Sequence, residues 1–291
     1  GSEMCIRDSS GKIARIGGVA IYVSFVVCMA VFMKTDMTIN GILIGGSIMF
    51  IGGLIDDMVN LSPKLKLLFE IAAAIVLMMV GKVSLDVIRL PLGITIDMGI
   101  ISFLVTFVWI IGITNAVNLI DGLDGLAGGI STIILIVVAC LSAIEGRMDI
   151  QTMSLILAGA TMGFLIYNSH PASIFMGDCG ALFLGFIISA ISLLGFKSST
   201  IMTLALPILL LAVPIVDTLG AILRRKLSGH KFSDADKKHV HHLLMQRFGQ
   251  RNTVLILYVV TALFGFTAYI YLVNKTAGFV VLFIIALIVE L

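Results

Sequence analysis

Long runs of apolar residues, separated by short polar segments, set the pattern of this chain. Ten runs approach the length needed to cross roughly 30 Å of hydrocarbon. They lie at about 18–33, 41–55, 65–80, 99–114, 126–144, 152–167, 180–196, 201–223, 253–273 and 277–291. Because a backbone in lipid must satisfy its own hydrogen bonds, each run is predicted to be an α-helix. The pattern therefore predicts an all-α integral membrane protein, a polytopic bundle of about ten transmembrane helices.

Composition excludes a soluble domain. Hydrophobic residues make up 59% of the chain and charged residues only 12%, whereas soluble domains carry about 25% charged residues. The net charge of +2 is too small to indicate a nucleic-acid partner. Residues 1–10 lack the apolar core of a signal peptide and are expected to be a non-native or disordered leader. Residues 11–291 are then one transmembrane domain.

The basic residues gather on one side of the predicted bundle. Thirteen of the nineteen Lys and Arg residues lie in the loops that begin the chain or follow the second, fourth, sixth and eighth runs. By the positive-inside rule this side is cytoplasmic. The same loops carry nearly all of the polar motifs, so we expect a cytoplasmic active site. On the opposite side, residues 87–97 alternate around Pro91 and Gly93 and predict a short hairpin.

The densest polar motif is the stretch 115–129, NAVNLIDGLDGLAGG. Asn115 and Asn118 are three residues apart, as are Asp121 and Asp124, so in a helix each pair would share a face. The surrounding glycines allow a ligand to approach the backbone. The alternative is a polar loop with glycines for close helix packing, but four regularly spaced polar side chains favour a binding site.

Five aspartates on the same side, at positions 56, 57, 121, 124 and 178, indicate a hard cation. Asp56 and Asp57 end the second run, where they could also simply mark the membrane boundary, and Asp178 lies between two glycines before the seventh run. Oxygen ligands without cysteine suit Mg²⁺, which binds through one or two carboxylates plus substrate phosphates. We therefore expect Mg²⁺, with Mn²⁺ as a substitute.

Two further loops add an aromatic and a cationic group. In NSHPASIFMGDCG (168–180), Phe175 could stack on a base, although interfacial burial is an equal alternative, and His170 is expected to be structural. The basic loop 224–252 carries His239, His241 and His242. Ser233 and Asp236 resemble a capping box that starts a helix there. Zinc or anionic lipid are the alternatives for this loop, but three histidines suit phosphate oxygens better.

Together these groups favour phosphoryl transfer, in which catalysis is mostly positioning and charge neutralisation. Their place at a membrane face implies that one substrate is a lipid. An ion-coupled transporter is the rival from another class. It would predict inverted repeats and carboxylates in the middle of the spans, whereas here the carboxylates lie at the ends of the apolar runs.

Five motifs, taken in order, resemble one family. They are GLIDDMVNLSPK, NAVNLIDGLDGLAGG, NSHPASIFMGDCGALFLG, PIVDTLGAILRR and DADKKHVHHLL. They resemble the polyprenyl-phosphate N-acetylhexosamine-1-phosphate transferases of glycosyltransferase family 4, which include the phospho-MurNAc-pentapeptide translocase. Members usually begin with one more helix and a Pro-Arg-x-Gly-Gly loop. Here Ala14 stands before Arg15, and the domain is expected to lack that first helix.

The resemblance implies a Mg²⁺-dependent enzyme of the bacterial cytoplasmic membrane. Undecaprenyl phosphate would attack a UDP-N-acetylhexosamine and release UMP, initiating a cell-envelope polysaccharide. It implies catalytic roles for Asp56, Asp57 and Asp178, with Asp56 activating the lipid phosphate and Asp178 binding the metal with Asn118. The residues expected at the substrate are Asn115, Asp121, Asp124, Asn168, Phe175, His239, His241 and His242. A homodimer is compatible with the family.

The histidine motif predicts the sugar. In the pentapeptide translocases the motif resembles three consecutive histidines, whereas Val240 interrupts it here. The HVHH form is similar to the N-acetylglucosamine-1-phosphate group, so UDP-GlcNAc is the expected donor. The pentapeptide translocase reaction is the alternative.

Overall fold

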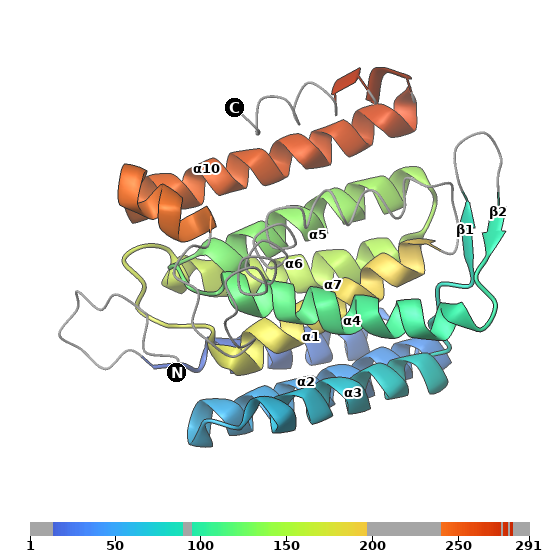
Figure 1. The fold of residues 1–291 in the computed structure, drawn as a ribbon, viewed down its shortest axis with the longest axis horizontal. Helices are drawn as coiled ribbons and strands as arrows, with labels where there is room; N and C mark the ends of the chain where they lie inside the picture. Colours follow the sequence, from blue (N-terminus) through green and yellow to red (C-terminus); the bar gives the residue numbers. More distant parts are fainter. Residues whose placement is uncertain (1–13, 90–94, 197–239, 275, 279, 282–291) are drawn as a thin grey trace, which may run out of the picture.

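The computed structural model describes residues 14–89, 95–196, 240–274, 276–278, 280 and 281 (Figure 1). Helices form most of this part of the chain. They are α1 (Gly17–Phe32), α2 (Met37–Val59), α3 (Pro63–Met79), α4 (Ile101–Ile120), α5 (Leu126–Ile144), α6 (Met148–Asn168), α7 (Gly177–Phe196) and α10 (Val240–Val273). α10 is kinked at Gly249, whose φ of 74° is not helical, so a short first part and a long second part meet there. Each overlaps one predicted apolar run. The run at 201–223 and most of the run at 277–291 lie outside the described residues.

Six of the described helices are long and apolar enough to cross a membrane: α2, α4, α5, α6, α7 and α10. α1 is a shorter apolar helix. The prediction of a multi-pass helical membrane protein is therefore confirmed, while the total of about ten helices stays a prediction.

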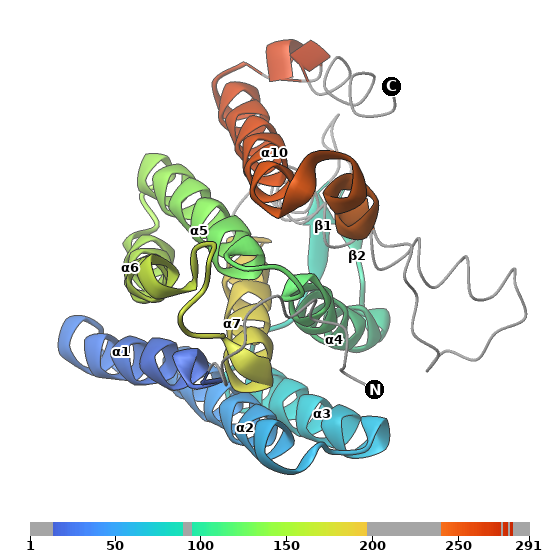
Figure 2. The ribbon, with the colours of Figure 1, turned by 90° about the vertical axis from the view of Figure 1, so that its left-hand side faces the viewer.

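α7 lies at the centre of the bundle (Figure 2). Its sequence is apolar on nearly every side, and such a helix is expected in a buried position. Among the described residues, Phe183 and Phe186 of α7 are almost fully buried, and Phe25 of α1 packs edge-on against Phe183 at a centroid distance of 5.6 Å. α7 contacts α1, α2, α4, α5 and α6, so the position of its first turn depends on these neighbours.

The predicted hairpin is confirmed. β1 (Val87–Arg89) and β2 (Thr95–Asp97) pair antiparallel, with Val87 opposite Asp97 and Ile88 opposite Ile96. The two strands lie at one end of the bundle (Figure 1).

The polar motifs meet at the other end. Because successive helices alternate in direction, the last turns of α2, α4 and α6 and the first turns of α3, α5 and α7 share this end (Figure 1). Three chain segments distant in sequence are thereby brought together away from the hairpin.

Candidate active site

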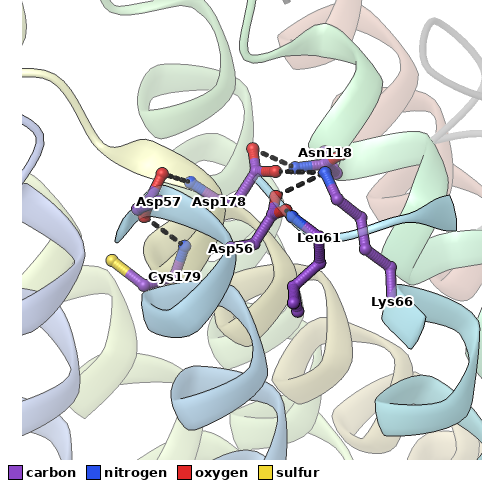
Figure 3. Close-up of polar contacts among 7 residues, drawn as sticks. All are labelled: Asp56, Asp57, Leu61, Lys66, Asn118, Asp178 and Cys179. Carbon is purple, nitrogen blue, oxygen red and sulfur yellow. Dashed lines mark hydrogen bonds and ion pairs between the residues drawn. The ribbon is translucent and has the colours of Figure 1, made fainter. Parts of the chain in front are cut away.

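Two carboxylates share one ammonium group at the polar end of the bundle (Figure 3). Lys66 Nζ donates to Asp178 Oδ2 at 2.8 Å and also forms an ion pair with Asp56. Asn118 Nδ2 donates to Asp178 Oδ1 at 3.3 Å. Asp56 is buried, whereas the Asp178 and Lys66 side chains are each about one third exposed. A ligand can therefore reach the cluster from the solvent side.

A tight turn between α2 and α3 builds this cluster. Asn60 ends α2 in the left-handed conformation, and Pro63 begins α3 three residues later. The Leu61 N–H donates to Asp56 Oδ1 at 2.6 Å, which holds that carboxylate against the turn. Lys66 lies in the first turn of α3 and reaches back across the turn to Asp56.

Asp57 has a different partner. Asp57 Oδ1 accepts the Asp178 N–H at 2.9 Å, and its Oδ2 accepts the Cys179 N–H at 3.0 Å (Figure 3). The two adjacent aspartates therefore do not act on one common group: Asp56 faces Lys66, and Asp57 faces the start of α7.

The two asparagines lie on α4, as the spacing predicts for a helix. Asn118 contacts Asp178 of α7. Asn115, one turn earlier, donates through Nδ2 to Glu70 Oε2 of α3 at 2.6 Å and to the Ile111 carbonyl at 3.0 Å. Glu70 is buried, so Asn115 satisfies a carboxylate inside the bundle. The structure thus places Asn115 below the exposed cluster and Asn118 within it.

Asp121 and Asp124 do not share a helix face, because α4 ends at Ile120. The chain turns before α5, and Gly125 adopts a positive φ of 78°. Burial raises the pKa of the Asp121 carboxyl well above its usual value, and the nearby charges of Asp178 and Asp57 raise it further, while Arg15 opposes the shift. A positive charge bound nearby would therefore favour the ionised form of Asp121.

The other carboxylate of this turn holds the neighbouring loop. Asp124 Oδ2 lies 2.9 Å from His170 Nδ1 and accepts the Ala172 N–H at 3.2 Å. This contact gives His170 the structural partner that the sequence led us to expect.

Asn168 and Phe175 connect the same loop to the rest of the protein. Asn168 is buried; its Oδ1 accepts the Gly125 N–H at 3.0 Å, and its Nδ2 donates to the Ile174 carbonyl at 2.8 Å. The Phe175 backbone accepts from the Gly17 N–H and donates to the Ala14 carbonyl, each at 3.0 Å. The Phe175 ring is partly buried. In the described structure the Asn168 side chain therefore holds two loops together through these hydrogen bonds.

The three histidines are only partly covered by the structure. His239 lies outside the described residues, as does the predicted capping box at Ser233 and Asp236. The backbone of His241 and His242 lies in the first turn of α10. Further along α10, the Tyr258 hydroxyl donates to the Gly125 carbonyl at 2.5 Å. α10 is therefore attached to the turn that carries Asp121 and Asp124.

Lys66 and Glu70 were not predicted as site residues. A sequence signal was available: both are charged positions at the start of an otherwise apolar run, and their spacing of four places them on one helix face. The sequence does not show which residues Lys66 and Glu70 contact, because their partners lie on the separate helices α2, α4 and α7.

The donor set suits a cation bound jointly with phosphate. Within the described ranges, no three His, Cys, Asp or Glu side chains come together as a complete metal site. Asp56 and Asp178 instead surround an ammonium group, so their oxygens already converge on a positive charge. Carboxylates from two helices, with the amide of Asn118, fit Mg²⁺ because that ion completes its octahedron with water and substrate phosphates.

Comparison with known proteins identifies relatives of this chain. Residues 39–196, which extend from the first turn of α2 to the end of α7, match the family described as Glycosyl transferase family 4. A Bacillus subtilis protein described as a probable undecaprenyl-phosphate N-acetylglucosaminyl 1-phosphate transferase is 41% identical over 87% of this chain and 72% of its own. A Mycolicibacterium smegmatis decaprenyl-phosphate N-acetylglucosaminephosphotransferase is 32% identical over 87% of this chain and 70% of its own. A Staphylococcus carnosus phospho-N-acetylmuramoyl-pentapeptide-transferase is 28% identical over 73% of this chain and 70% of its own.

Proposed function

Because the chain belongs to glycosyltransferase family 4, we propose that it transfers N-acetylglucosamine 1-phosphate from UDP-N-acetylglucosamine to undecaprenyl phosphate and releases UMP. The observation that carries the proposal is the cluster of Asp56, Lys66 and Asp178 at the polar end of a membrane bundle. A buried carboxylate, a cation and a carboxylate open to solvent are the groups that a reaction between two phosphates requires.

The reaction joins two anions, so charge must be neutralised before they meet. An oxygen of the lipid phosphate attacks the sugar-bearing phosphorus of the UDP-sugar, and the bond from that phosphorus to the bridging oxygen of UMP breaks. Lys66 supplies a fixed positive charge beside Asp56 and Asp178. Asp56 is the buried carboxylate of the cluster and is the group that would accept a proton from, or orient, the lipid phosphate.

Asp178 and Asn118 would hold Mg²⁺, for which Mn²⁺ can substitute. The ion would supply charge neutralisation on the diphosphate when bound. Asp178 supports this assignment because it is the more exposed of the two carboxylates around Lys66. Asn118 already touches its other oxygen and can turn its amide oxygen toward a cation.

The nucleotide would lie over the turn between α4 and α5 and the loop 169–176. Asp121 and Phe175 border this region, and Asp124 and Asn168 hold its two segments together. His239, His241 and His242 would approach the phosphates from the start of α10. The attachment of α10 to Gly125 through Tyr258 supports that placement.

The relatives favour the smaller donor sugar. The N-acetylglucosamine-1-phosphate relative has 41% identity, whereas the pentapeptide-transferase relative has 28%. The interrupted HVHH motif agrees with this difference. The site of this reaction would be the cytoplasmic face of a bacterial inner membrane, where a soluble nucleotide sugar meets a membrane lipid.

The test is a comparison of donors with the purified protein. UMP release is measured in detergent with undecaprenyl phosphate and either UDP-GlcNAc or UDP-MurNAc-pentapeptide, and a reaction without lipid phosphate is the control. We expect UMP only when lipid phosphate is present, and a higher kcat/KM for UDP-GlcNAc. A preference of tenfold or more for the pentapeptide donor, equivalent to about 1.4 kcal/mol in the transition state, would assign the alternative reaction.

A further inference from the structure

Asp56 and Asp57 are adjacent in α2 but serve different helices (Figure 3). Successive residues of an α-helix point about 100° apart, because a turn takes 3.6 residues. Asp56 faces Lys66 at the start of α3. Asp57 faces α7, where its two oxygens accept the N–H groups of Asp178 and Cys179 at 2.9 and 3.0 Å.

α7 has no side chain of its own to cap its first turn. The first N–H groups of a helix lack partners within it, and Ser, Thr, Asp or Asn usually supplies the acceptor. α7 begins instead at Gly177, which has a positive φ of 74° and no side chain. A Cβ atom at this position would lie 2.6 Å from Asp57 Oδ2, so glycine lets the carboxylate approach. A negative charge at this point is also favoured by the helix dipole.

Close packing fixes the same turn from two other sides. A Cβ atom on Gly53 of α2 would lie 2.5 Å from the Cys179 Cα, and one on Gly18 of α1 would lie 2.5 Å from the Gly180 Cα. The first turn of α7 therefore rests directly on the backbones of α1 and α2. The Asp178 side chain leaves this turn toward Lys66 and Asn118, so its position follows that of the turn.

We propose that Asp57 is a positioning residue: its carboxylate caps α7 from α2 and thereby sets the Asp178 carboxylate at the reacting centre. Asp57 then exchanges no proton with the substrate. Of the two adjacent aspartates, Asp56 takes part in the reaction, and Asp57 holds the start of α7 in position. The consequence for catalysis rests on the proposed function, in which Asp178 binds the metal.

The experiment compares variants of the full chain purified in detergent. Mn²⁺ binding is measured by electron paramagnetic resonance, and thermal unfolding is followed by intrinsic fluorescence. The value of kcat for UMP release is measured as a function of pH. Asp57→Ala is expected to weaken Mn²⁺ binding about tenfold or more and to lower the unfolding midpoint. The matched control is Asp36→Ala, since Asp36 Oδ1 caps α2 through the Ile39 N–H at 2.7 Å. Asp36→Ala should lower the midpoint of thermal unfolding while leaving the affinity for Mn²⁺ unchanged.

Two further variants separate positioning from proton transfer. Asp57→Asn keeps one acceptor oxygen, so it should retain the acidic limb of the pH profile at reduced kcat. In the Asp57→Ala background, Gly177→Asn should recover part of both the midpoint and the Mn²⁺ affinity. Asparagine tolerates a positive φ, and loss of the Asp57 carboxylate leaves room for its side chain, which can then cap α7 instead.

Two results would overturn the inference. One is wild-type Mn²⁺ affinity together with a wild-type unfolding midpoint in Asp57→Ala. The other is loss of the acidic limb in Asp57→Asn while Mn²⁺ affinity is unchanged, which would make Asp57 a proton acceptor. A wild-type protein that binds no Mn²⁺ would instead overturn the metal assignment of the proposed function, and the unfolding midpoints would then decide whether Asp57 caps α7.

Discussion

At the scale of single residues, the site is governed by an excess of negative charge. Asp56 and Asp178 share Lys66, and Asp121 lies in the next turn with a pKa raised by its burial. The lipid phosphate and the diphosphate of the nucleotide sugar would add further negative charge to the same region. Such a site needs a mobile cation as well as a fixed one, because a single ammonium cannot balance carboxylates and substrates together.

Removal of the Asp178 charge should therefore abolish metal-dependent turnover. Asp178→Asn is expected to lower kcat about 100-fold or more, equivalent to about 2.7 kcal/mol, and to leave the unfolding midpoint almost unchanged because Lys66 keeps Asp56 as a partner. The measurement is UMP release over a Mg²⁺ titration.

The control is Asp149→Asn on α6, whose carboxylate is half-exposed and paired with Arg147 at 3.1 Å. An exposed ion pair contributes little to stability, so this variant should match the wild type. A near-normal rate for Asp178→Asn at limiting Mg²⁺ would remove Asp178 from the metal site.

At the scale of elements, the peptide unit of Gly125 joins three segments. Its N–H donates to Asn168 Oδ1 at 3.0 Å, and its carbonyl accepts the Tyr258 hydroxyl at 2.5 Å. Its positive φ of 78° suits glycine, because other residues rarely adopt this conformation without strain. Gly125 thus connects the turn between α4 and α5 with the loop 169–176 and with α10 through these hydrogen bonds.

Loss of the Tyr258 hydroxyl should loosen α10 from this point. Tyr258→Phe keeps the ring but removes one hydrogen bond, which contributes about 1 kcal/mol. The short part of α10 that carries His241 and His242 is joined to the part that carries Tyr258 through the kink at Gly249. We therefore expect a KM for UDP-GlcNAc raised about threefold to tenfold, with the KM for undecaprenyl phosphate unchanged. Steady-state kinetics with each substrate varied in turn measure both values.

Tyr269→Phe is the matched control, since Tyr269 lies on the same helix but is exposed and stacks on Phe266. Equal rises of both KM values in Tyr258→Phe, or the same effect in Tyr269→Phe, would contradict a specific role for this contact.

At the scale of the whole molecule, the polar end and the hairpin end should face opposite sides of the membrane. Lys64 lies at the polar end beside the start of α3, and Lys82 follows α3 at the other end; both side chains are exposed. With Cys5, Cys28 and Cys140 replaced, and with Cys179 buried, Lys82→Cys should react with an impermeant maleimide in whole cells. Lys64→Cys should react only in inside-out vesicles. Labelling of both positions from the same side would contradict the assigned topology.

The sequence by itself determined the membrane character, the approximate positions of the described helices and the hairpin. These features depend on local patterns, since an apolar run in lipid has few alternatives to a helix and alternating residues around Pro91 and Gly93 favour a hairpin. The sequence also placed Asn115 and Asn118 correctly on one helix. Alternation of the helices was enough to predict that the motif loops share one end, because each span reverses the direction of the chain.

Only the tertiary structure decided which polar groups meet. Lys66 bonds to Asp178 across 112 positions of sequence, and Asp57 bonds to the same residue's backbone across 121. No local pattern encodes such partners, because they depend on how α2, α3 and α7 cross. The same holds for Asn168, which the family resemblance places near the nucleotide: its buried amide bonds to Gly125 and Ile174 and holds two loops together. A polar residue at a membrane face can bind a ligand or satisfy the backbone, and only the packing around it distinguishes the two roles.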